Sequence, residues 1–485
     1  MAIITGKQYI NRIDDLQNEV WIEGERVEGK LSLHPAFRGI LKSKGLLYDM
    51  QHDPSAQSVL TRTDNECDEL INFSFKQPVT MEDLQKRKEA IQLWARKSGG
   101  TIGRSPDYIN TAIMTLATSH TYFDEPYATS IKTIYNESKK KDLSFTHTFI
   151  NPQANRSPHY FESLQEQTKE QIIAAKIIEK KEQGIVIHGA RLLATQGGMT
   201  DEILVLPVGG DTLDDNYIYA FAIPSNTPGL RFLCREPYAS QATSSYDHPF
   251  TYQFDEIDSV VVFDHVLVPW ERVFIYQQKD IVRRLSIDTN LTEMLLFQAI
   301  SRQVVKTEFL LGICESIATT ISVHEYQHVQ DKISEVITTF EIMKSLLESS
   351  INGAAPNRFG TMVPARNPLM VASTYYQKTY PRLIEILHLL GASGLIALPT
   401  ENDFSSSIGA DLHQYLQAKN AKAKERVQLF RLAWDLTMSP FGSRQTQYER
   451  FFFGDPIRQS SYLYQAYDKS FFIKQIKEFL KNCTT

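Results

Sequence analysis

The sequence predicts an α+β protein that is mostly helical, with an N-terminal helical domain, a middle antiparallel β-barrel-like domain and a C-terminal helical bundle. Three observations predict this class: apolar residues follow a helical period up to about residue 142, a strand period from there to about 276, and a helical period afterwards. A chain of 485 residues is also too long for one ordinary core. We therefore expect three domains packed into one subunit, at residues 1–142, 143–276 and 277–485.

The N-terminal part contains one clearly delimited helix. Thr80 begins the run TMED, which offers a helix cap followed by acidic residues in the first turn, and the helix from Met81 to Lys97 ends at Gly99-Gly100. A second helix is predicted from Tyr108 to Phe123. The loop TIGRSPDY therefore connects two helices.

The middle part consists of short strand-like runs separated by turn residues: AAKIIEKKE, IVIHGARLLA, ILVLPV, YIYAFAI, LRFLC and SVVVFDHVLVP. These runs are short and rich in the β-branched and aromatic residues that suit strands. Because turn residues separate these short runs, an antiparallel sheet or a small barrel is expected.

The last part contains long amphipathic helices. One apolar stripe includes Leu296, Ile300, Val304 and Leu311, and a second includes Val329, Ile333, Val336, Phe340, Met343 and Leu347. Pro381 is predicted to interrupt a third helix, and GASGLIALP separates it from a fourth at about 409–438. The order of helical, strand-rich and helical-bundle parts suggests the acyl-CoA dehydrogenase architecture, in which a flavin lies between the middle and last domains.

Composition excludes several classes of function. A net charge of -6 and a pI of about 6.1 give no basic field for nucleic acid. The start of the chain has no signal-peptide pattern, and the most apolar stretch, residues 383–398, carries Glu385 and is too short to span a bilayer. The 4 cysteines are far apart and form no CxxC motif. We expect a cytoplasmic protein without membrane or nucleic-acid partners.

Five ordered blocks carry the most specific signal: GRSPDY at 103–108, THTFINPQANRS at 146–157, GIVIHGARLLAT at 184–195, VVFDHVLVPWERVF at 261–274 and YERFFFGDP at 448–456. Together they resemble the 4-hydroxyphenylacetate 3-monooxygenase oxygenase family. Because the blocks are spread over most of the chain in a fixed order, they are more specific than any single motif.

The resemblance implies a two-component aromatic monooxygenase with the acyl-CoA-dehydrogenase-like fold. Members of the family receive FADH2 from a separate NAD(P)H-dependent flavin reductase and form a flavin C4a-hydroperoxide with molecular oxygen. They then hydroxylate a phenol ortho to its hydroxyl group, and a homotetramer is expected. The chain contains no GxGxxG motif after a strand, which fits an enzyme that does not bind nicotinamide itself.

Arg104, Tyr108 and His147 match the phenol-binding positions of the family. A flavin hydroperoxide is an electrophile, so its phenol partner reacts best when deprotonated, and a fixed cation with hydrogen-bond donors stabilises that charge. By resemblance, Arg104 supplies the permanent charge, Tyr108 a hydroxyl donor, and His147 a group titrating near neutrality that assists proton removal. Without the resemblance, an arginine in a loop and an isolated histidine are usually structural.

The resemblance also indicates the cofactor site. The expected FAD-binding residues are His147, Thr148, Gln153, Arg156, Thr195, Gly454, Asp455 and Pro456. Arg156 would meet the pyrophosphate, because a guanidinium fork suits phosphate oxygens, and Thr195 would reach the N5 edge of the flavin. The simpler alternatives are a locally satisfied strand hydroxyl for Thr195 and an ordinary turn for Gly454–Pro456.

A loop that starts at Pro207 and Val208 is expected to meet the acid group of the substrate. Its sequence, PVGGDT, offers backbone donors but no cation for a carboxylate. The native substrate therefore stays open between 4-hydroxyphenylacetate and another phenol.

Two other functions compete with this interpretation. HEYQH at 324–328 matches HExxH, which on one helix would place His324 and His328 on one face to bind zinc, with Glu325 as general base and Glu348 as a further ligand. The apolar stripe from Val329 onward argues against this metallopeptidase, because it leaves no separate helix to return Glu348 to the site. The third class is a catalytically idle flavin-binding or assembly protein, which would lack the phenol-binding residues that this chain retains.

Overall fold

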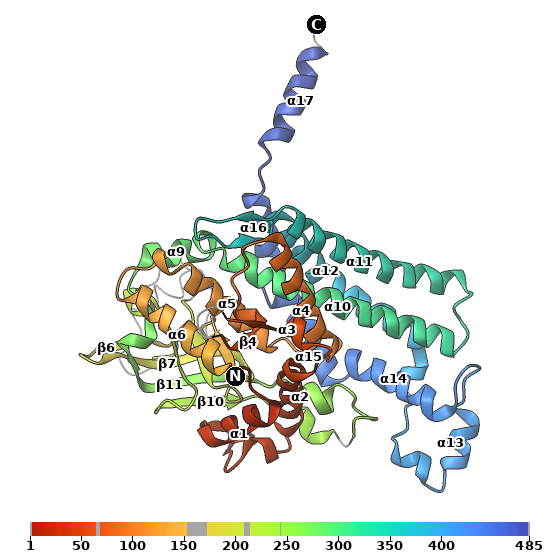
Figure 1. Ribbon diagram of the computed structural model, residues 1–485. Helices are drawn as coiled ribbons and strands as arrows, with labels where there is room; N and C mark the ends of the chain where they lie inside the picture. Colours follow the sequence, from red (N-terminus) through yellow and green to blue (C-terminus); the bar gives the residue numbers. More distant parts are fainter. Residues whose placement is uncertain (1, 65–67, 153–171, 208–213, 243, 484–485) are drawn as a thin grey trace.

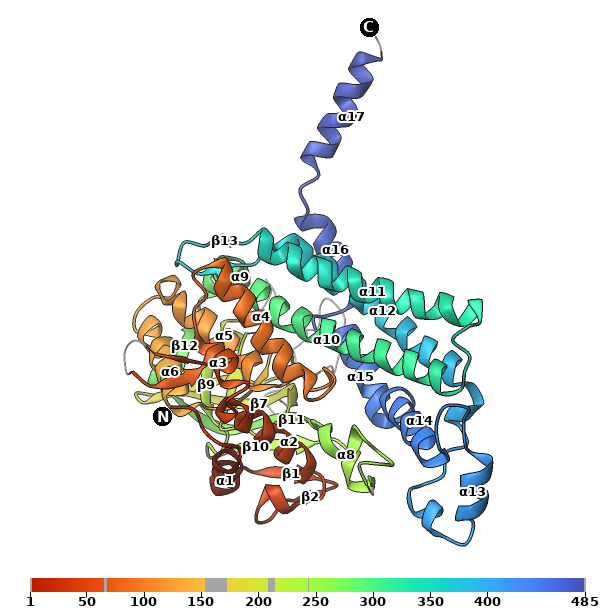
Figure 2. The same ribbon diagram turned by 45° about the vertical axis from the view of Figure 1, so that its right-hand side comes forward.

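The computed structural model describes residues 2–64, 68–152, 172–207, 214–242 and 244–483. Short N-terminal helices and the β-sheets lie on one side of the molecule, and long helices form a bundle on the other (Figures 1 and 2). The predicted order of helical, strand-rich and helical-bundle parts is confirmed. We propose to keep the domain boundaries at 142/143 and 276/277, close to the first residues of β5 (Phe145–Thr148) and α9 (Lys279–Asp288).

The N-terminal part is built from short and medium helices. They are α1 (Gly6–Leu16), α2 (Arg38–Asp49), α3 (Gln57–Leu60), α4 (Met81–Arg96), α5 (Pro106–Thr118) and α6 (Tyr127–Lys141). The Thr80 side chain accepts the amide of Asp83 while the Asp83 carboxylate accepts the amide of Thr80, so a capping box starts α4 as expected. The second predicted helix, α5, is confirmed but ends at Thr118 rather than Phe123.

The middle part contains open sheets. The 6-stranded sheet has the order β2 (Glu25–Arg26), β1 (Val20–Ile22), β10 (Leu230–Cys234), β11 (Asp258–Pro269), β7 (Gly184–Thr195) and β6 (Lys176–Lys180). Among the described residues no barrel closes, because the N-terminal strands β1 and β2 extend one edge of the sheet. The pairing is also not purely antiparallel, since β1 runs parallel to β10. The barrel-like and antiparallel expectations therefore need this correction.

A 4-stranded sheet positions the candidate site. Its order is β12 (Val273–Tyr276), β9 (Tyr219–Pro224), β8 (Glu202–Val205) and β5 (Phe145–Thr148), with β5 parallel to β8. The hydroxyl of Thr146 donates to the carbonyl of Thr195 at 2.7 Å, and that of Thr148 donates to the carbonyl of Leu192 at 2.7 Å. These bonds place the end of β5 beside the end of β7.

Two short hairpins and a short helix lie outside these two sheets. They are β3 (Thr61–Thr63) with β4 (Leu70–Asn72), β13 (Ala355–Pro356) with β14 (Met362–Val363), and α8 (Thr251–Phe254).

The C-terminal part is a bundle of long helices. Its helices are α9 (Lys279–Asp288), α10 (Leu291–Thr320), α11 (Gln327–Asn352), α12 (Arg366–Gly391), α14 (Ala423–Thr437) and α15 (Pro440–Phe451). Pro381 does not interrupt α12, contrary to the prediction. Tyr380 and Leu383 on either side of it are buried, so packing outweighs the loss of one backbone hydrogen bond.

The helix predicted at about 409–438 is in fact two helices, α13 (Gly409–Tyr415) and α14. After α15 the chain forms α16 (Pro456–Ala466) and α17 (Ser470–Asn482), and α17 projects away from the rest of the molecule in both views (Figures 1 and 2). In the described part of the chain, no helix combines the length and the apolar character needed to cross a membrane.

A buried cluster joins the parts that surround the candidate site. It contains Tyr108 and Ile109 of α5, Phe145 of β5, Leu204 of β8 and Leu291 of α10. Burial of these apolar side chains stabilises the contact between the N-terminal helices, the 4-stranded sheet and the bundle by roughly 1.5–3 kcal/mol for each large side chain.

Candidate active site

The loop between α4 and α5 carries Arg104 and is held by close contacts. Gly99 and Gly100 end α4 with φ of +57° and +75°, a conformation that favours glycine. A Cβ atom on Gly103 would lie 2.5 Å from the phenolic oxygen of Tyr448, so only glycine fits there. The two oxygens of the Glu256 carboxylate accept the backbone amides of Gly103 and Arg104, each at 2.8 Å.

The Arg104 side chain is buried between aromatic rings. Its guanidinium carbon lies 4.8 Å from the ring centre of Tyr108 and 4.8 Å from that of Phe452. Nη1 donates to the hydroxyl of Tyr448 at 3.1 Å and to the carbonyl of Gly103 at 3.2 Å. Nε is buried and has no hydrogen-bond partner among the described residues. A buried cation with an unused donor is suited to bind an anionic oxygen.

His147 lies beside the same group. Its ring centre is 5.7 Å from that of Tyr108 and 4.1 Å from that of Phe149. Its Nδ1 atom is buried and, within the part of the chain that the structure describes, has no hydrogen-bond partner. The structure thus brings together all three residues that the sequence predicted to bind the phenol.

Electrostatics define the protonation states of these groups. Burial, followed by the charge of Arg104, holds the pKa of His147 well below its usual value. The imidazole is therefore neutral at pH 7 in the protein alone, rather than titrating near neutrality as predicted. Burial also raises the pKa of the Tyr108 phenol, which keeps its proton. The site offers one permanent cation, one hydroxyl donor and one neutral nitrogen acceptor.

Thr195, a predicted flavin residue, takes part in a buried polar network. Its hydroxyl donates to Asp258 Oδ1 at 2.7 Å, and Arg444 of α15 donates to both carboxylate oxygens of Asp258 at 2.5 and 2.7 Å. Although burial alone raises the pKa of Asp258, Arg444 and Arg235 lower it well below its usual range. The Thr195 proton is therefore directed to a charged carboxylate, and its oxygen is left as an acceptor.

The segment Gly454–Pro456 forms the start of α16. Asp455 caps this helix, its side chain accepting the amides of Ile457 and Arg458. The carbonyl of Gly454 accepts the side-chain amide of Gln377 at 3.1 Å. The segment thus has the local role of a helix cap, and its predicted role in flavin binding stays a prediction.

Other predicted positions are only partly described. Pro207 follows β8 and is half-buried, whereas Gln153, Arg156 and Val208 lie outside the described residues. Thr148 is buried in β5.

A buried ion cluster supports α15 from the bundle side. Arg302 donates to both oxygens of Glu449 at 2.7 and 3.1 Å, and Lys306 donates to Glu449 at 2.8 Å. Arg302 also lies 5.4 Å from the ring centre of Tyr448. The cluster fixes the helix that contributes Tyr448 and Phe452 to the site.

The HEYQH segment does not have the geometry of a zinc site. His324 and Glu325 lie in a turn, and α11 begins only at Gln327, so His324 and His328 are not on one helix. Glu348 is engaged by Lys88 instead. Among the described residues, the His, Cys, Asp or Glu side chains that lie close enough to share a metal ion do not include His324 or His328. The metallopeptidase hypothesis is wrong because the helix on which it depends starts too late.

Several residues of the site were missed by the sequence reasoning. Tyr448 and Phe452 lie within the YERFFFGDP block, of which only the last three residues were assigned. Tyr448 lies four residues after Arg444 on the same face of α15, and Phe452, four residues later, directly follows the last residue of that helix. Glu256 has no local sequence signal. Asn151 is buried three residues after the end of β5, and both polar atoms of its side chain lack partners within the described ranges.

Two family models match the chain. The model for the "4-hydroxyphenylacetate 3-hydroxylase N terminal" domain covers residues 5–275, and that for the "4-hydroxyphenylacetate 3-hydroxylase C terminal" domain covers residues 282–481. The chain belongs to the 4-hydroxyphenylacetate 3-hydroxylase family. This membership confirms the predicted family and the prediction of a flavin-dependent aromatic monooxygenase, the oxygenase component of a two-component system.

Relatives match over the whole length. A probable 4-hydroxyphenylacetate 3-monooxygenase of Bacillus subtilis is 48% identical, with 99% of each chain covered. The oxygenase component of 4-hydroxyphenylacetate 3-monooxygenase from Thermus thermophilus is 41% identical and covers 98% of this chain and 97% of its own. A solved structure of such an oxygenase component, complexed with FAD and 4-hydroxyphenylacetate, is 40% identical with a TM-score of 0.94 and 99% of each chain covered. FAD, the predicted cofactor, is thus the cofactor of a closely similar 4-hydroxyphenylacetate 3-hydroxylase structure.

Proposed function

We propose that this protein hydroxylates a small phenol such as 4-hydroxyphenylacetate ortho to its hydroxyl group, using FADH2 and molecular oxygen. The observation that carries the proposal is the buried guanidinium of Arg104, which lies between Tyr108 and Phe452 with its Nε unpaired among the described residues. An aromatic substrate suits this place, because rings can pack against rings while the phenolic oxygen meets the cation.

Each phenol-binding residue has a distinct role. Arg104 stabilises the negative charge on the phenolic oxygen, and Tyr108, whose pKa is raised by burial, donates a hydrogen bond to it. His147 is neutral, and its unpaired Nδ1 is available to accept the phenolic proton. Once protonated, His147 would lie near the positive Arg104, and the single negative charge of the phenolate would offset part of their repulsion.

FAD fits the residues next to this group. When bound, FADH2 supplies the oxygenating chemistry together with molecular oxygen. The Thr195 hydroxyl donates its hydrogen bond to Asp258, so its oxygen is left to accept, which matches the N5–H of a reduced flavin. The side-chain amide of Asn151, which lies three residues after β5 and has no partner among the described residues, offers a donor and an acceptor. We assign His147, Thr148, Thr195 and Gly454–Pro456 to this site. The resemblance also assigns Gln153 and Arg156, which lie outside the described residues, with Arg156 meeting the pyrophosphate.

A separate reductase is the expected partner. The chain has no GxGxxG motif after a strand, and its relatives are named as oxygenase components. We therefore infer that FADH2 arrives from an NAD(P)H-dependent flavin reductase, by diffusion or in a transient contact. Because this partner would need NAD(P)H, we place the protein in the cytoplasm.

The sequence of the substrate loop bears on which phenols can bind. Pro207 lies at the end of β8, and the glycine-rich residues that follow it in the sequence supply backbone donors rather than a cation. A phenol with a neutral substituent would therefore bind comparably to one with a carboxylate. Comparison of 4-hydroxyphenylacetate with its methyl ester measures this preference.

We also propose a homotetramer. On α17, Phe472, Ile476 and Leu480 recur every four residues and are exposed in the isolated subunit. A helix with such a stripe needs an apolar partner surface. Light scattering on the full chain and on a chain lacking residues 470–485 tests this assembly; a monomeric full chain would contradict it.

The decisive experiment begins without oxygen. The protein is mixed with FADH2 under nitrogen, binding is measured by fluorescence, and oxygenated buffer with 4-hydroxyphenylacetate is then added. We expect tight binding of FADH2 and one catechol product per bound cofactor. Absence of FADH2 binding, or binding with no hydroxylated product from any of a panel of phenols, would exclude this function.

A further inference from the structure

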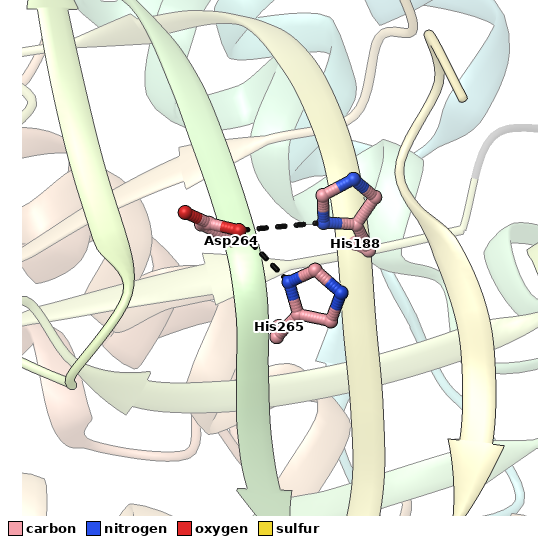
Figure 3. Close-up of side chains that lie close together, drawn as sticks. All are labelled: His188, Asp264 and His265. Carbon is pink, nitrogen blue, oxygen red and sulfur yellow. Dashed lines mark hydrogen bonds and ion pairs between the residues drawn. The ribbon is translucent and has the colours of Figure 1, made fainter. Parts of the chain in front are cut away.

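Two histidines and an aspartate meet on the strand pair β7–β11 (Figure 3). Phe263 pairs with Gly189 and Val266 pairs with Ile187, so a β-bulge places two residues, Asp264 and His265, opposite the single residue His188. His265 has φ of +56°, the left-handed conformation that the bulge requires. The side chains of all three residues converge because of this bulge (Figure 3).

The distances within this group suit a metal ion. Asp264 Oδ1 lies 2.8 Å from His265 Nδ1 and 3.7 Å from His188 Nδ1. Ligand bonds of about 2.0–2.2 Å in a tetrahedral zinc site separate the donor atoms by about 3.4 Å. The observed separations bracket this value. Each of the three side chains can offer one ligand atom, and these three atoms all lie within 4.8 Å of one another.

A second observation points to a ligand at this place. The Nδ1 atom of His188 is buried and has no hydrogen-bond partner within the described ranges. A neutral imidazole nitrogen with a free lone pair is the form that binds transition metals.

The neighbouring charges allow a cation here. Arg231 of β10 donates to Asp264 Oδ2 at 3.0 Å, which orients the carboxylate and leaves Oδ1 facing the imidazoles. The positive charge of Arg231 also opposes a metal ion. The exposed fractions are 31% for His188, 47% for Asp264 and 65% for His265, so water can complete the coordination.

We propose that His188, Asp264 and His265 form a binding site for one divalent transition-metal ion, Zn²⁺ or Cu²⁺. Two imidazoles and one carboxylate are ligands that these ions accept, and magnesium or calcium would require more oxygen donors. The ion would join β7 to β11 across the bulge. His188 lies seven residues before Thr195 on β7, roughly 20 Å away at about 3.3 Å per residue, so the site is distinct from the active site.

The test is titration of the untagged full chain with ZnCl2 and with CuCl2 by calorimetry. We expect one ion per subunit and a higher melting temperature with the metal. His188→Ala and His265→Ala should each weaken binding at least about tenfold. Arg231→Gln should strengthen it, because the variant removes the opposing charge.

A matched control uses the histidines of HEYQH. His324→Ala together with His328→Ala should leave the stoichiometry and affinity unchanged, since neither residue belongs to the cluster. FADH2 binding should be equal in all these variants, which also verifies folding. No stoichiometric binding of either ion, or equal affinity in His188→Ala and the natural protein, would overturn the proposal.

Discussion

Glu256 Oε1 accepts a hydrogen bond of 2.8 Å from the backbone amide of Arg104. The Glu256 carboxylate is fully buried and also accepts the amide of Gly103 and the side-chain amide of Gln196. Glu256 precedes β11, whereas Arg104 lies between α4 and α5. The backbone that carries Arg104, the cation proposed to bind the phenol, is therefore fixed by the middle part of the chain and not only by its own helices.

Glu256→Gln tests this positioning role. Glutamine has one acceptor oxygen where the two amides of Gly103 and Arg104 need two, so one amide loses its partner at a cost of about 1–3 kcal/mol. We expect a lower melting temperature and, because Arg104 is less firmly placed, a smaller fraction of oxygen consumption that yields catechol. Product and hydrogen peroxide are measured at saturating phenol.

The exposed Glu271 provides the control for this change. Glu271→Gln should alter neither stability nor coupling. If Glu256→Gln lowers the melting temperature but couples oxygen to hydroxylation as well as the natural protein does, Glu256 has only a structural role.

Arg104→Ala removes the permanent charge from the site. Because the Arg104 side chain packs against the rings of Tyr108 and Phe452, neither of which is assigned to the flavin, FADH2 should still bind. Hydroxylation should fall by about 10²–10³-fold, and hydrogen peroxide should be released in its place. Unchanged hydroxylation would remove Arg104 from the mechanism.

Arg104→Lys separates charge from shape. Lysine keeps the positive charge but loses the planar fork that reaches Tyr448 and packs between two rings. Activity between that of Arg104→Ala and that of the natural protein is expected. The control is Arg96→Ala, since Arg96 forms an exposed pair with Glu308 and should not affect coupling.

The fold was predictable where local chemistry decides it. The start of α4 follows from Thr80 and Asp83, which cap the helix within one turn. Pro381 shows the limit, because its effect on α12 depends on the burial of Tyr380 and Leu383 by other helices. Likewise, no local pattern reveals that β1 pairs with β10, more than 200 residues later.

The site was predictable only where a motif matched. The residues Arg104, Tyr108 and His147 came from sequence blocks, and the structure brings them together. Glu256 acts on Arg104 across a separation of 152 residues, and its neighbours form no motif that indicates a contact. The protonation state of His147 also depends on burial, which a sequence does not give.

Thr195→Val tests the predicted flavin contact with little change in shape. Asp258 keeps Arg444 and Arg235 as partners, so the loss of one hydrogen bond should cost only about 1 kcal/mol of stability. Coupling should fall, because the acceptor assigned to N5–H is absent. Thr195→Ser retains the hydroxyl and should retain coupling; equal coupling in both variants would assign Thr195 to packing alone.

Glu449 makes stability depend on pH. Burial by itself raises the pKa of Glu449, but Arg302 and Lys306 lower it to about 2, from an ordinary value of 4.5 in the unfolded chain. A carboxylate whose pKa is lower in the folded state stabilises the protein above its unfolded pKa. This contribution, roughly 3 kcal/mol, is lost as the pH falls from about 5 to 2.

Lys306→Gln tests this linkage without leaving a buried charge unpaired. Glu449 keeps both bonds from Arg302, so the bundle should fold, while the pKa of Glu449 rises because one cation is lost. Acid unfolding, followed by circular dichroism, should therefore begin at a higher pH than in the natural protein. Glu335→Gln, which removes a half-exposed partner of Arg382, should leave the acid midpoint nearly unchanged. Equal acid midpoints for Lys306→Gln and the natural protein would mean that Arg302 alone determines the charge of Glu449.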